Sequence, residues 1–322
     1  MEMADFKELT PRECCELLLS VKKPLVVMHI RPDGDTVGSG AALCEIFREL
    51  GTTPKYACHD AIPERLAFLL VGYERTEDFE GLTPVAIDIA SPAQLGSLYE
   101  RLTPLFSIDH HKINTPFSDN YTVSTASSAG EVLLDVARAL VDMGKLTLTK
   151  RIAERIYAAI SSDTGGFVYS NASAKTYRDA AELILLGIDH ADINKRLFDS
   201  KSKAEIVAEG FVGSRLKASA DGKIAYAVIS RDERDSLSLP FSAFENAIDV
   251  VRALRGAEVA FVVKETDSGE FKASLRSTGK NVAEIAARHS GGGHIRAAGC
   301  TVKADSAQDA AKILLTELSE TV

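Results

Sequence analysis

The chain has 322 residues, of which 45% are hydrophobic, and this length exceeds what one hydrophobic core usually supports, so two domains are expected. Its 46 acidic and 37 basic residues give a formal net charge of -9, which disfavours a protein that holds long duplex DNA through the phosphates. The amino-terminal residues lack the basic-then-apolar order of a signal peptide, and no apolar run has the length of a membrane span. We therefore expect a soluble cytoplasmic protein without a membrane partner.

Short apolar runs alternate with amphipathic stretches through the first 190 residues. Strand-like runs begin after Lys23 and recur at 54–58, 84–89 and 104–108, while helical periodicity covers 36–50, 130–140, 149–160 and 174–186. Such alternation predicts an α/β fold with a doubly wound, mostly parallel sheet.

The pattern changes beyond a charged stretch of helical composition at 195–209. Strands are expected at 224–230, 259–264 and 271–276, separated by Asp-Gly and Asp-Ser-Gly turns, and helices at 244–255 and 282–289. We therefore predict a first domain at 1–192, a helical linker at 193–212 and a smaller α/β domain at 213–322.

The five cysteines form no C-x-x-C pair. Neither a zinc knuckle nor a disulfide framework is indicated, so buried, reduced thiols are expected.

Titratable residues gather where the predicted strands of the first domain end. They are His29, Asp33, Asp35, Asp88, Asp109, His110, His111 and, after a helix, Asp163. Ligands of parallel sheets bind beyond the carboxyl ends of the strands, so we expect these side chains at one edge. Singly, such residues are more often ordinary turn or strand-end residues. Together the carboxylates would repel one another unless cations neutralised them, and mixed oxygen and imidazole ligands suit manganese, iron, cobalt or zinc.

Four segments resemble the motifs of the DHH phosphoesterase superfamily: His29-Ile-Arg-Pro-Asp33-Gly-Asp35, the Asp88 strand, Asp109-His110-His111 and Ser162-Asp163-Thr164-Gly165. Downstream, Ser274-Leu-Arg276-Ser277, Asn281-Val-Ala-Glu-Ile-Ala and Gly291-Gly-Gly-His294-Ile-Arg-Ala-Ala-Gly299 resemble the DHH-associated C-terminal domain. The layout is similar to the nano-RNase and phosphoadenosine phosphate phosphatase group. One departure is Arg288-His289-Ser290, where the family commonly has an aromatic residue and a further glycine.

The resemblance implies a hydrolase with two divalent metal ions, for which manganese is the expected metal. It places His29, Asp33 and Asp88 on one ion, and Asp35, Asp88, His110 and Asp163 on the other. His111 is then the candidate for protonating or orienting the leaving oxygen. Asp109 is the candidate for orienting a neighbouring histidine.

The resemblance also implies that the second domain binds the substrate, with the active site in the cleft between the two domains. The residues concerned are Arg276, Ser277, Gly291, Gly292, Gly293, His294 and Arg296. From the residues alone, the three glycines are equally well explained as a flexible turn. Ser127-Ser128-Ala129-Gly130 likewise has two interpretations, an anion site or a helix N-cap.

The expected substrates are short oligoribonucleotides, 3'-phosphoadenosine 5'-phosphate, and linear or cyclic dinucleotides. The alternatives are a polyphosphate or pyrophosphate hydrolase that uses the same metals, and a non-catalytic nucleotide sensor on the same fold. The preferred substrate, the cleavage polarity, the metal and the oligomeric state, including a homodimer, stay open.

Overall fold

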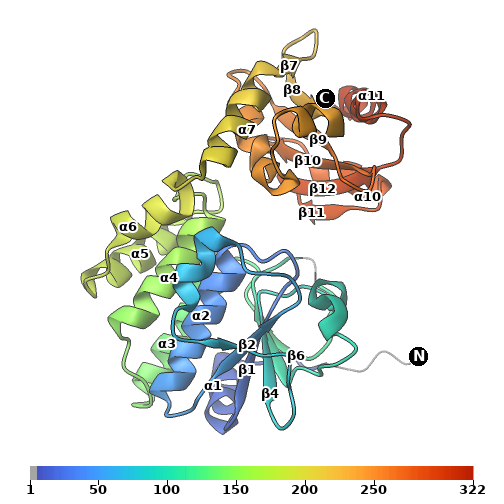
Figure 1. Cartoon of the computed structure of the whole chain (residues 1–322). Helices are drawn as coiled ribbons and strands as arrows, with labels where there is room; N and C mark the ends of the chain where they lie inside the picture. Colours follow the sequence, from blue (N-terminus) through green and yellow to red (C-terminus); the bar gives the residue numbers. More distant parts are fainter. Residues whose placement is uncertain (1–5, 113, 322) are drawn as a thin grey trace. The chain divides into compact units, whose positions relative to one another are not determined.

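The computed structural model describes residues 6–112 and 114–321, without the side chains of residues 294 and 321. The chain forms two compact units, Met1–Ser200 and Lys201–Val322 (Figure 1). Within the described residues, no helix is both long and apolar enough to cross a membrane.

A six-stranded parallel sheet forms the centre of the first unit, with the strand order β3-β2-β1-β4-β5-β6. The strands are β1 (Pro24–Met28), β2 (Lys55–Cys58), β3 (Glu74–Arg75), β4 (Thr83–Ile87), β5 (Phe106–Asp109) and β6 (Asp119–Thr122). The order reverses between β1 and β4, and in doubly wound sheets such a switch point opens a crevice for ligands. The structure therefore confirms the α/β sheet that the sequence predicts.

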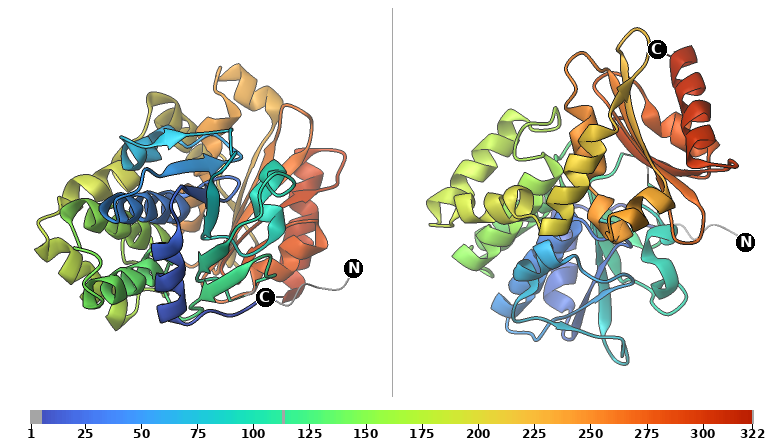
Figure 2. Two further views of the ribbon diagram at one scale, coloured as in Figure 1. Left: turned by 90° about the horizontal axis from the view of Figure 1, so that it is seen from below. Right: turned by 45° about the horizontal axis from the view of Figure 1, so that its top comes forward.

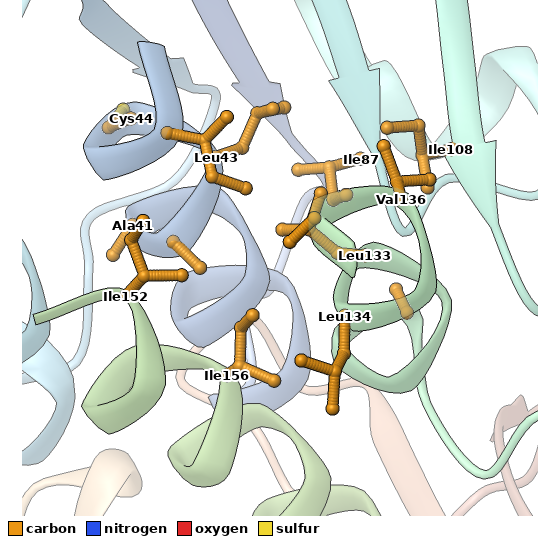
Figure 3. Close-up of a cluster of buried hydrophobic side chains, with 14 of the residues drawn as sticks. Ala41, Leu43, Cys44, Ile87, Ile108, Leu133, Leu134, Val136, Ile152 and Ile156 are labelled. Carbon is orange, nitrogen blue, oxygen red and sulfur yellow. The ribbon is translucent and has the colours of Figure 1, made fainter. Parts of the chain in front are cut away.

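Helices cover one face of this sheet. They are α1 (Pro11–Ser20), α2 (Gly34–Glu49), α3 (Ala129–Asp142) and α4 (Lys150–Asp163). Figure 3 shows Leu133 and Val136 of α3 beside Ile87 and Ile108 of the strands, and Ile156 of α4 among the helices of the same cluster. The other face packs against the 3-10 helix η2 (Pro92–Leu98), through Leu95 and Leu98.

The remaining elements of the first unit are η1 (Glu64–Leu70), α5 (Ala174–Leu185), α6 (His190–Asn194) and the π-helix η3 (Lys195–Asp199). Side chains that accept hydrogen bonds from free backbone N–H groups set several helix starts. Thr10 and Ser173 form capping boxes at α1 and α5, and Ser128 and Thr149 cap α3 and α4.

The second unit contains a mixed six-stranded sheet in the order β11-β12-β10-β9-β8-β7. Its strands are β7 (Lys217–Ala218), β8 (Ile224–Ile229), β9 (Val259–Glu265), β10 (Phe271–Ser277), β11 (Gly292–His294) and β12 (Ala297–Val302). One face packs on α10 (Val282–Arg288) and on α11 (Ala307–Thr321), which lies along the sheet in Figure 2. The other face packs on α7 (Lys203–Ser214), the 3-10 helix η4 (Phe241–Phe244) and α9 (Ala247–Arg252). The short helix α8 (Arg231–Ser236) follows β8.

Two local expectations differ from the structure. The helix expected at 244–255 is divided into η4 and α9, and Gly292 and Gly293 belong to strand β11. Part of the predicted linker forms α7, whose Ala208 and Val212 are buried in the second unit. All five cysteines are free and buried, as expected.

Candidate metal centre

One group of possible ligands stands at the switch point of the first sheet. His29 follows β1, Asp33 is the N-cap of α2, and Asp88 follows β4. His29 Nε2 lies 3.4 Å from Asp88 Oδ2 and 3.7 Å from Asp33 Oδ1. His29 Nδ1 lies 2.6 Å from the carbonyl oxygen of Ile30, which fits an Nδ1–H donor and leaves Nε2 as the ligand atom.

A second group lies beside the first. His110 Nε2 lies 3.5 Å from Asp88 Oδ1, 3.6 Å from Asp35 Oδ2 and 4.0 Å from Asp163 Oδ2. Asp88 is thus next to both histidines, one through each carboxylate oxygen. In each of the sets His29-Asp33-Asp88, Asp35-His110-Asp163 and Asp88-His110-His111, the potential ligand atoms lie within 4.8 Å of one another.

Small residues bring the helices that carry these carboxylates close together. A Cβ atom at Gly38 of α2 would lie 2.8 Å from the backbone nitrogen of Ala159 in α4. A Cβ atom at Gly130 of α3 would lie 2.5 Å from Ala159 Cβ. Because glycine has no side chain there, α2 and α3 approach α4 closely, and Asp35 meets Asp163 although they are far apart in the sequence.

The amino end of α3 binds the Asp35 carboxylate. The N–H groups of Ala129 and Gly130 donate to Asp35 Oδ2 and Oδ1 at 2.7 and 3.1 Å. Ser128 at the same time caps α3 by accepting from the Glu131 N–H. The segment therefore acts both as a helix N-cap, through Ser128, and as an anion site. The anion that it binds is the carboxylate of Asp35.

Asp109 is fully buried at the end of β5 and lies next to His111. Asp109 Oδ1 is 2.7 Å from His111 Nδ1 and accepts from the His110 N–H at 2.8 Å. Burial favours the neutral form of Asp109, but the bond to His111 lowers its pKa. Burial also lowers the pKa of His111, which Asp109 and Asp88 together raise to about 9.

The backbone around these ligands is strained. Asp88 itself has φ 60°, Arg31 between His29 and Asp33 has φ 52°, and Phe167 after Asp163 has φ 68°. Residues other than glycine rarely adopt such angles, which cost about 1–3 kcal/mol each and gather at functional sites. The strain at Asp88 turns the chain out of β4 as its carboxylate enters the cluster.

The local electrostatics are those of a site built for cations. Burial and the negative charges of Asp88 and Asp163 raise the pKa of Asp35 well above its ordinary value. Burial raises the pKa of Asp163 to about 7, helped by Asp33 and Asp88 and opposed by His110. Burial would lower the pKa of His29, but the bonds to Asp33 and Asp88 raise it to about 11. Positive charge is thus strongly favoured at this position.

The donors fit divalent metal ions. Among the described residues, the buried Asp88 Oδ1 has no hydrogen-bond donor, which is costly unless another group satisfies it. The atoms around it are carboxylate oxygens and imidazole nitrogens, the mixed set that manganese, iron, cobalt and zinc accept. No residue outside the predicted set is needed to complete the three groups.

Sequence reasoning missed Asn171. Its Nδ2 donates to Asp163 Oδ2 at 3.3 Å, to the Asp163 carbonyl at 3.1 Å and to the Ser127 carbonyl at 3.1 Å. Asn171 therefore holds Asp163 against the segment that precedes α3. The only signal in the sequence is its place eight residues after Asp163, which does not distinguish it from other loop asparagines.

The predicted substrate residues gather within the second unit. Arg276 and Ser277 end β10, and Arg276 pairs in register with Ala297, beside Arg296. The Ser277 N–H donates to the Arg296 carbonyl at 3.0 Å. The side chain of His294 lies outside the described part of the chain.

The glycines of this region are explained by close backbone packing. A Cβ atom at Gly291 would lie 2.2 Å from the Gly299 carbonyl oxygen, and Gly293, with φ 141°, would bring one to 2.5 Å from that of Ala297. Gly292 has open space around it. Ser290 adopts φ 54°, a conformation that glycine takes more easily.

A parallel sheet with a carboxylate and histidine cluster at its switch point is typical of a metal-dependent enzyme. Sequence profiles agree, since residues 23–160 match the DHH family, N-terminal domain, and residues 221–320 match the DHHA1 domain. The chain is 31% identical over 304 residues to the bifunctional oligoribonuclease and PAP phosphatase NrnA of Thermus thermophilus, covering 91% of this chain and 88% of the relative. The chain therefore belongs to the DHH family and is a phosphoesterase.

A second relative and a solved structure extend the likeness. The bifunctional oligoribonuclease and PAP phosphatase NrnA of Bacillus subtilis is 28% identical to this chain. The alignment covers 85% of this chain and 87% of the relative. The crystal structure of an exopolyphosphatase-related protein from Bacteroides fragilis aligns with a TM-score of 0.86 at 23% identity, over 96% of this chain and 95% of that one. At 23% identity, the Bacteroides fragilis structure supports the fold alone.

Proposed function

We propose that the protein uses two divalent ions, with manganese the expected metal, to hydrolyse short oligoribonucleotides and 3'-phosphoadenosine 5'-phosphate. The observation that carries the proposal is Asp88, whose two carboxylate oxygens lie beside His29 and His110 in two adjoining groups of ligands. The full-length similarity to relatives named as oligoribonucleases and PAP phosphatases supports the substrates.

We assign the ligands as the sequence predicted. His29, Asp33 and Asp88 hold one ion, and Asp35, Asp88, His110 and Asp163 hold the other. When bound, the ions supply positive charge that stabilises the oxygens on phosphorus and makes water a better nucleophile. The first unit supplies the charge that retains them.

We assign the protein's own side chains to orienting a catalytic histidine and to protonating the leaving oxygen. We assign Asp109 to orienting the His111 ring through Nδ1, and His111 Nε2 to protonating the leaving oxygen. We assign Arg276, Ser277, Gly291–Gly293, His294 and Arg296 to binding the phosphate of the substrate that is not cleaved. Cytoplasmic location, a homodimer, an active site between the two domains and the exclusion of long duplex DNA stay predictions.

The test is product release by the purified protein with manganese. The substrates are the adenosine bisphosphate, a diribonucleotide, linear and cyclic diadenylate, pyrophosphate and polyphosphate. We expect turnover of the bisphosphate and the short RNA that a chelator abolishes. Turnover of pyrophosphate or polyphosphate alone would contradict the substrate assignment, and metal binding without turnover of any of them would favour the nucleotide sensor.

Variants separate the roles. Asp88→Asn should lose bound metal and turnover together, whereas Asp142→Asn, an exposed aspartate at the end of α3, should change neither. His111→Ala should keep the metal and lose about 10²–10⁴ in kcat. Arg276→Ala should raise KM for the bisphosphate more than kcat falls. A fully active, metal-loaded Asp88→Asn protein would disprove the bridging role.

A further inference from the structure

A polar pocket of about 200 Å³ lies at the carboxyl ends of β2 and β3. None of the candidate metal ligands lines it. Its polar lining consists of His59, Arg75, Thr76, Glu77, Ser97 and Arg101, and we call it the arginine pocket.

Backbone carbonyls hold both guanidinium groups in place. Arg75 Nη2 donates to the carbonyls of Cys58 and His59 at 2.8 and 3.4 Å. Arg101 Nη2 donates to the carbonyl of Glu77 at 2.7 Å, and the guanidinium carbon lies 4.5 Å from the ring centre of Phe79. Each guanidinium has five N–H donors, and these bonds use only one terminal nitrogen of each. The other donors remain for a ligand.

The side chains of Arg75 and Arg101 are exposed, so solvent screens their charge. Within the part of the chain that the structure describes, neither Arg75 nor Arg101 forms an ion pair with a carboxylate. Arg138, by contrast, contacts the carboxylates of Asp135, Asp179 and Glu182 at 2.6–2.8 Å. In a chain with a net charge of -9, two guanidiniums that line one pocket without ion-pair partners offer charged hydrogen-bond donors to an oxyanion.

The rest of the lining is compatible with an anion. His59 Nδ1 lies 2.8 Å from Ser97 Oγ and 3.3 Å from the Ser97 backbone nitrogen, and His59 Nε2 lies 3.7 Å from Asp60 Oδ1. Glu77 is the one acidic residue in the lining, and its side chain is exposed.

The pocket is next to the loop that carries His29. Cys58 Sγ donates to the His29 carbonyl at 3.2 Å, and the Arg31 N–H donates to Asp60 Oδ2 at 2.7 Å. Neighbouring strands lie about 4.8 Å apart, so the ends of β2 and β3 are roughly 5–10 Å across the sheet from the end of β1. An anion in the pocket is therefore close to the metal centre without sharing its ligands.

We propose that the arginine pocket is a separate phosphate-binding site, which takes either inorganic phosphate or a terminal phosphate group of a nucleotide. Arg75 and Arg101 supply the charge-assisted hydrogen bonds. This inference goes beyond the proposed function, because it concerns binding and does not require hydrolysis.

The test is equilibrium dialysis of the manganese-loaded protein against radiolabelled inorganic phosphate at constant ionic strength. The variants are Arg75→Gln, Arg101→Gln and the double variant, with Arg12→Gln as the control because Arg12 is an exposed arginine of α1. We expect the double variant to bind one phosphate fewer per chain, or to bind it at least tenfold more weakly. Arg12→Gln should match the wild type.

Retained manganese content checks that each variant is folded. If the double variant fails to fold, Arg101→Gln alone serves, because it leaves the two Arg75 bonds in place. A structural role for the arginines would lower thermal stability without changing phosphate binding.

Kinetics distinguish the two sources of phosphate. If the pocket binds a substrate phosphate, the double variant raises KM for the adenosine bisphosphate but leaves KM unchanged for a diribonucleotide without a terminal phosphate. If the pocket binds free phosphate, the double variant binds less phosphate in the dialysis and both of its KM values equal those of the wild type. Unchanged dialysis together with unchanged KM values overturns the proposal. Absence of any turnover would contradict the proposed function but would leave the dialysis result valid.

Discussion

A methyl group added at Gly38 tests whether the close contact of α2 with α4 sets the geometry of the metal centre. The new Cβ would lie 2.8 Å from the Ala159 nitrogen and 2.9 Å from the Arg155 carbonyl oxygen, both main-chain atoms. Ordinary contact begins at 3.4 Å, so the helices must separate by about 0.6 Å. We expect Gly38→Ala to move Asp35 relative to Asp163.

The expected change in the stability of Gly38→Ala follows from two opposing effects. Alanine in place of glycine favours a helix by about 1 kcal/mol, whereas an extra methyl in a packed interior costs about 1–3 kcal/mol. The net loss of stability should be about 0–2 kcal/mol. Because small displacements of reacting groups are costly, manganese affinity and kcat should fall by more than this loss explains.

Gly210→Ala is the matched control, since Gly210 lies in α7 and nothing stands within 4 Å of a Cβ added there. It should stabilise the protein by up to about 1 kcal/mol. Urea unfolding and manganese titration of both variants provide the comparison. The reasoning is refuted if Gly38→Ala gains as much stability as Gly210→Ala and binds manganese as the wild type does.

Three further predictions follow from the same contacts. Asn171→Ala should weaken manganese binding about tenfold by releasing Asp163, measured by calorimetry; an unchanged affinity would remove Asn171 from a positioning role. Chelator should lower the melting temperature, because bound ions at 100 times their Kd stabilise by about 2.7 kcal/mol; an equal melting temperature with and without metal would argue against the ions. Burial lowers the pKa of Lys264 to about 8. Between pH 8 and 10.5 the ammonium is therefore deprotonated in the folded state but still protonated in the unfolded state, so the stability of the wild type increases as the pH rises through this range. Lys264→Met, which also loses the bond to the Phe244 carbonyl, should therefore be the more stable protein at pH 7, with the difference shrinking toward pH 10.5; a constant difference across this range would count against the shift.

Many of the elements can be predicted from local pattern. The buried strands after Lys23 and near Asp88 and Asp109 are short apolar runs, and their polar residues follow where each run stops. Elements without such a pattern were not predicted. Strand β12 contains Gly299 and small alanines, and its pairing with β10 and β11 rather than its composition makes it a strand. Tertiary packing also divides the helix expected at 244–255, because Phe244 packs into the core at the end of the 3-10 helix η4.

The sequence by itself determined the candidate ligands, because carboxylates and histidines at the ends of successive apolar runs must reach one edge of a parallel sheet. Only the tertiary structure decided how they are grouped. The approach of α2 and α3 to α4 depends on Gly38 and Gly130 meeting backbone and side-chain atoms far away in the sequence. The N–H groups that bind Asp35 and the amide of Asn171 that holds Asp163 are likewise contacts between distant segments. The same is true of the bonds from Arg75 and Arg101 to the carbonyls of Cys58 and Glu77. Local sequence patterns record which face of an element is buried, but not which atoms of another element it meets.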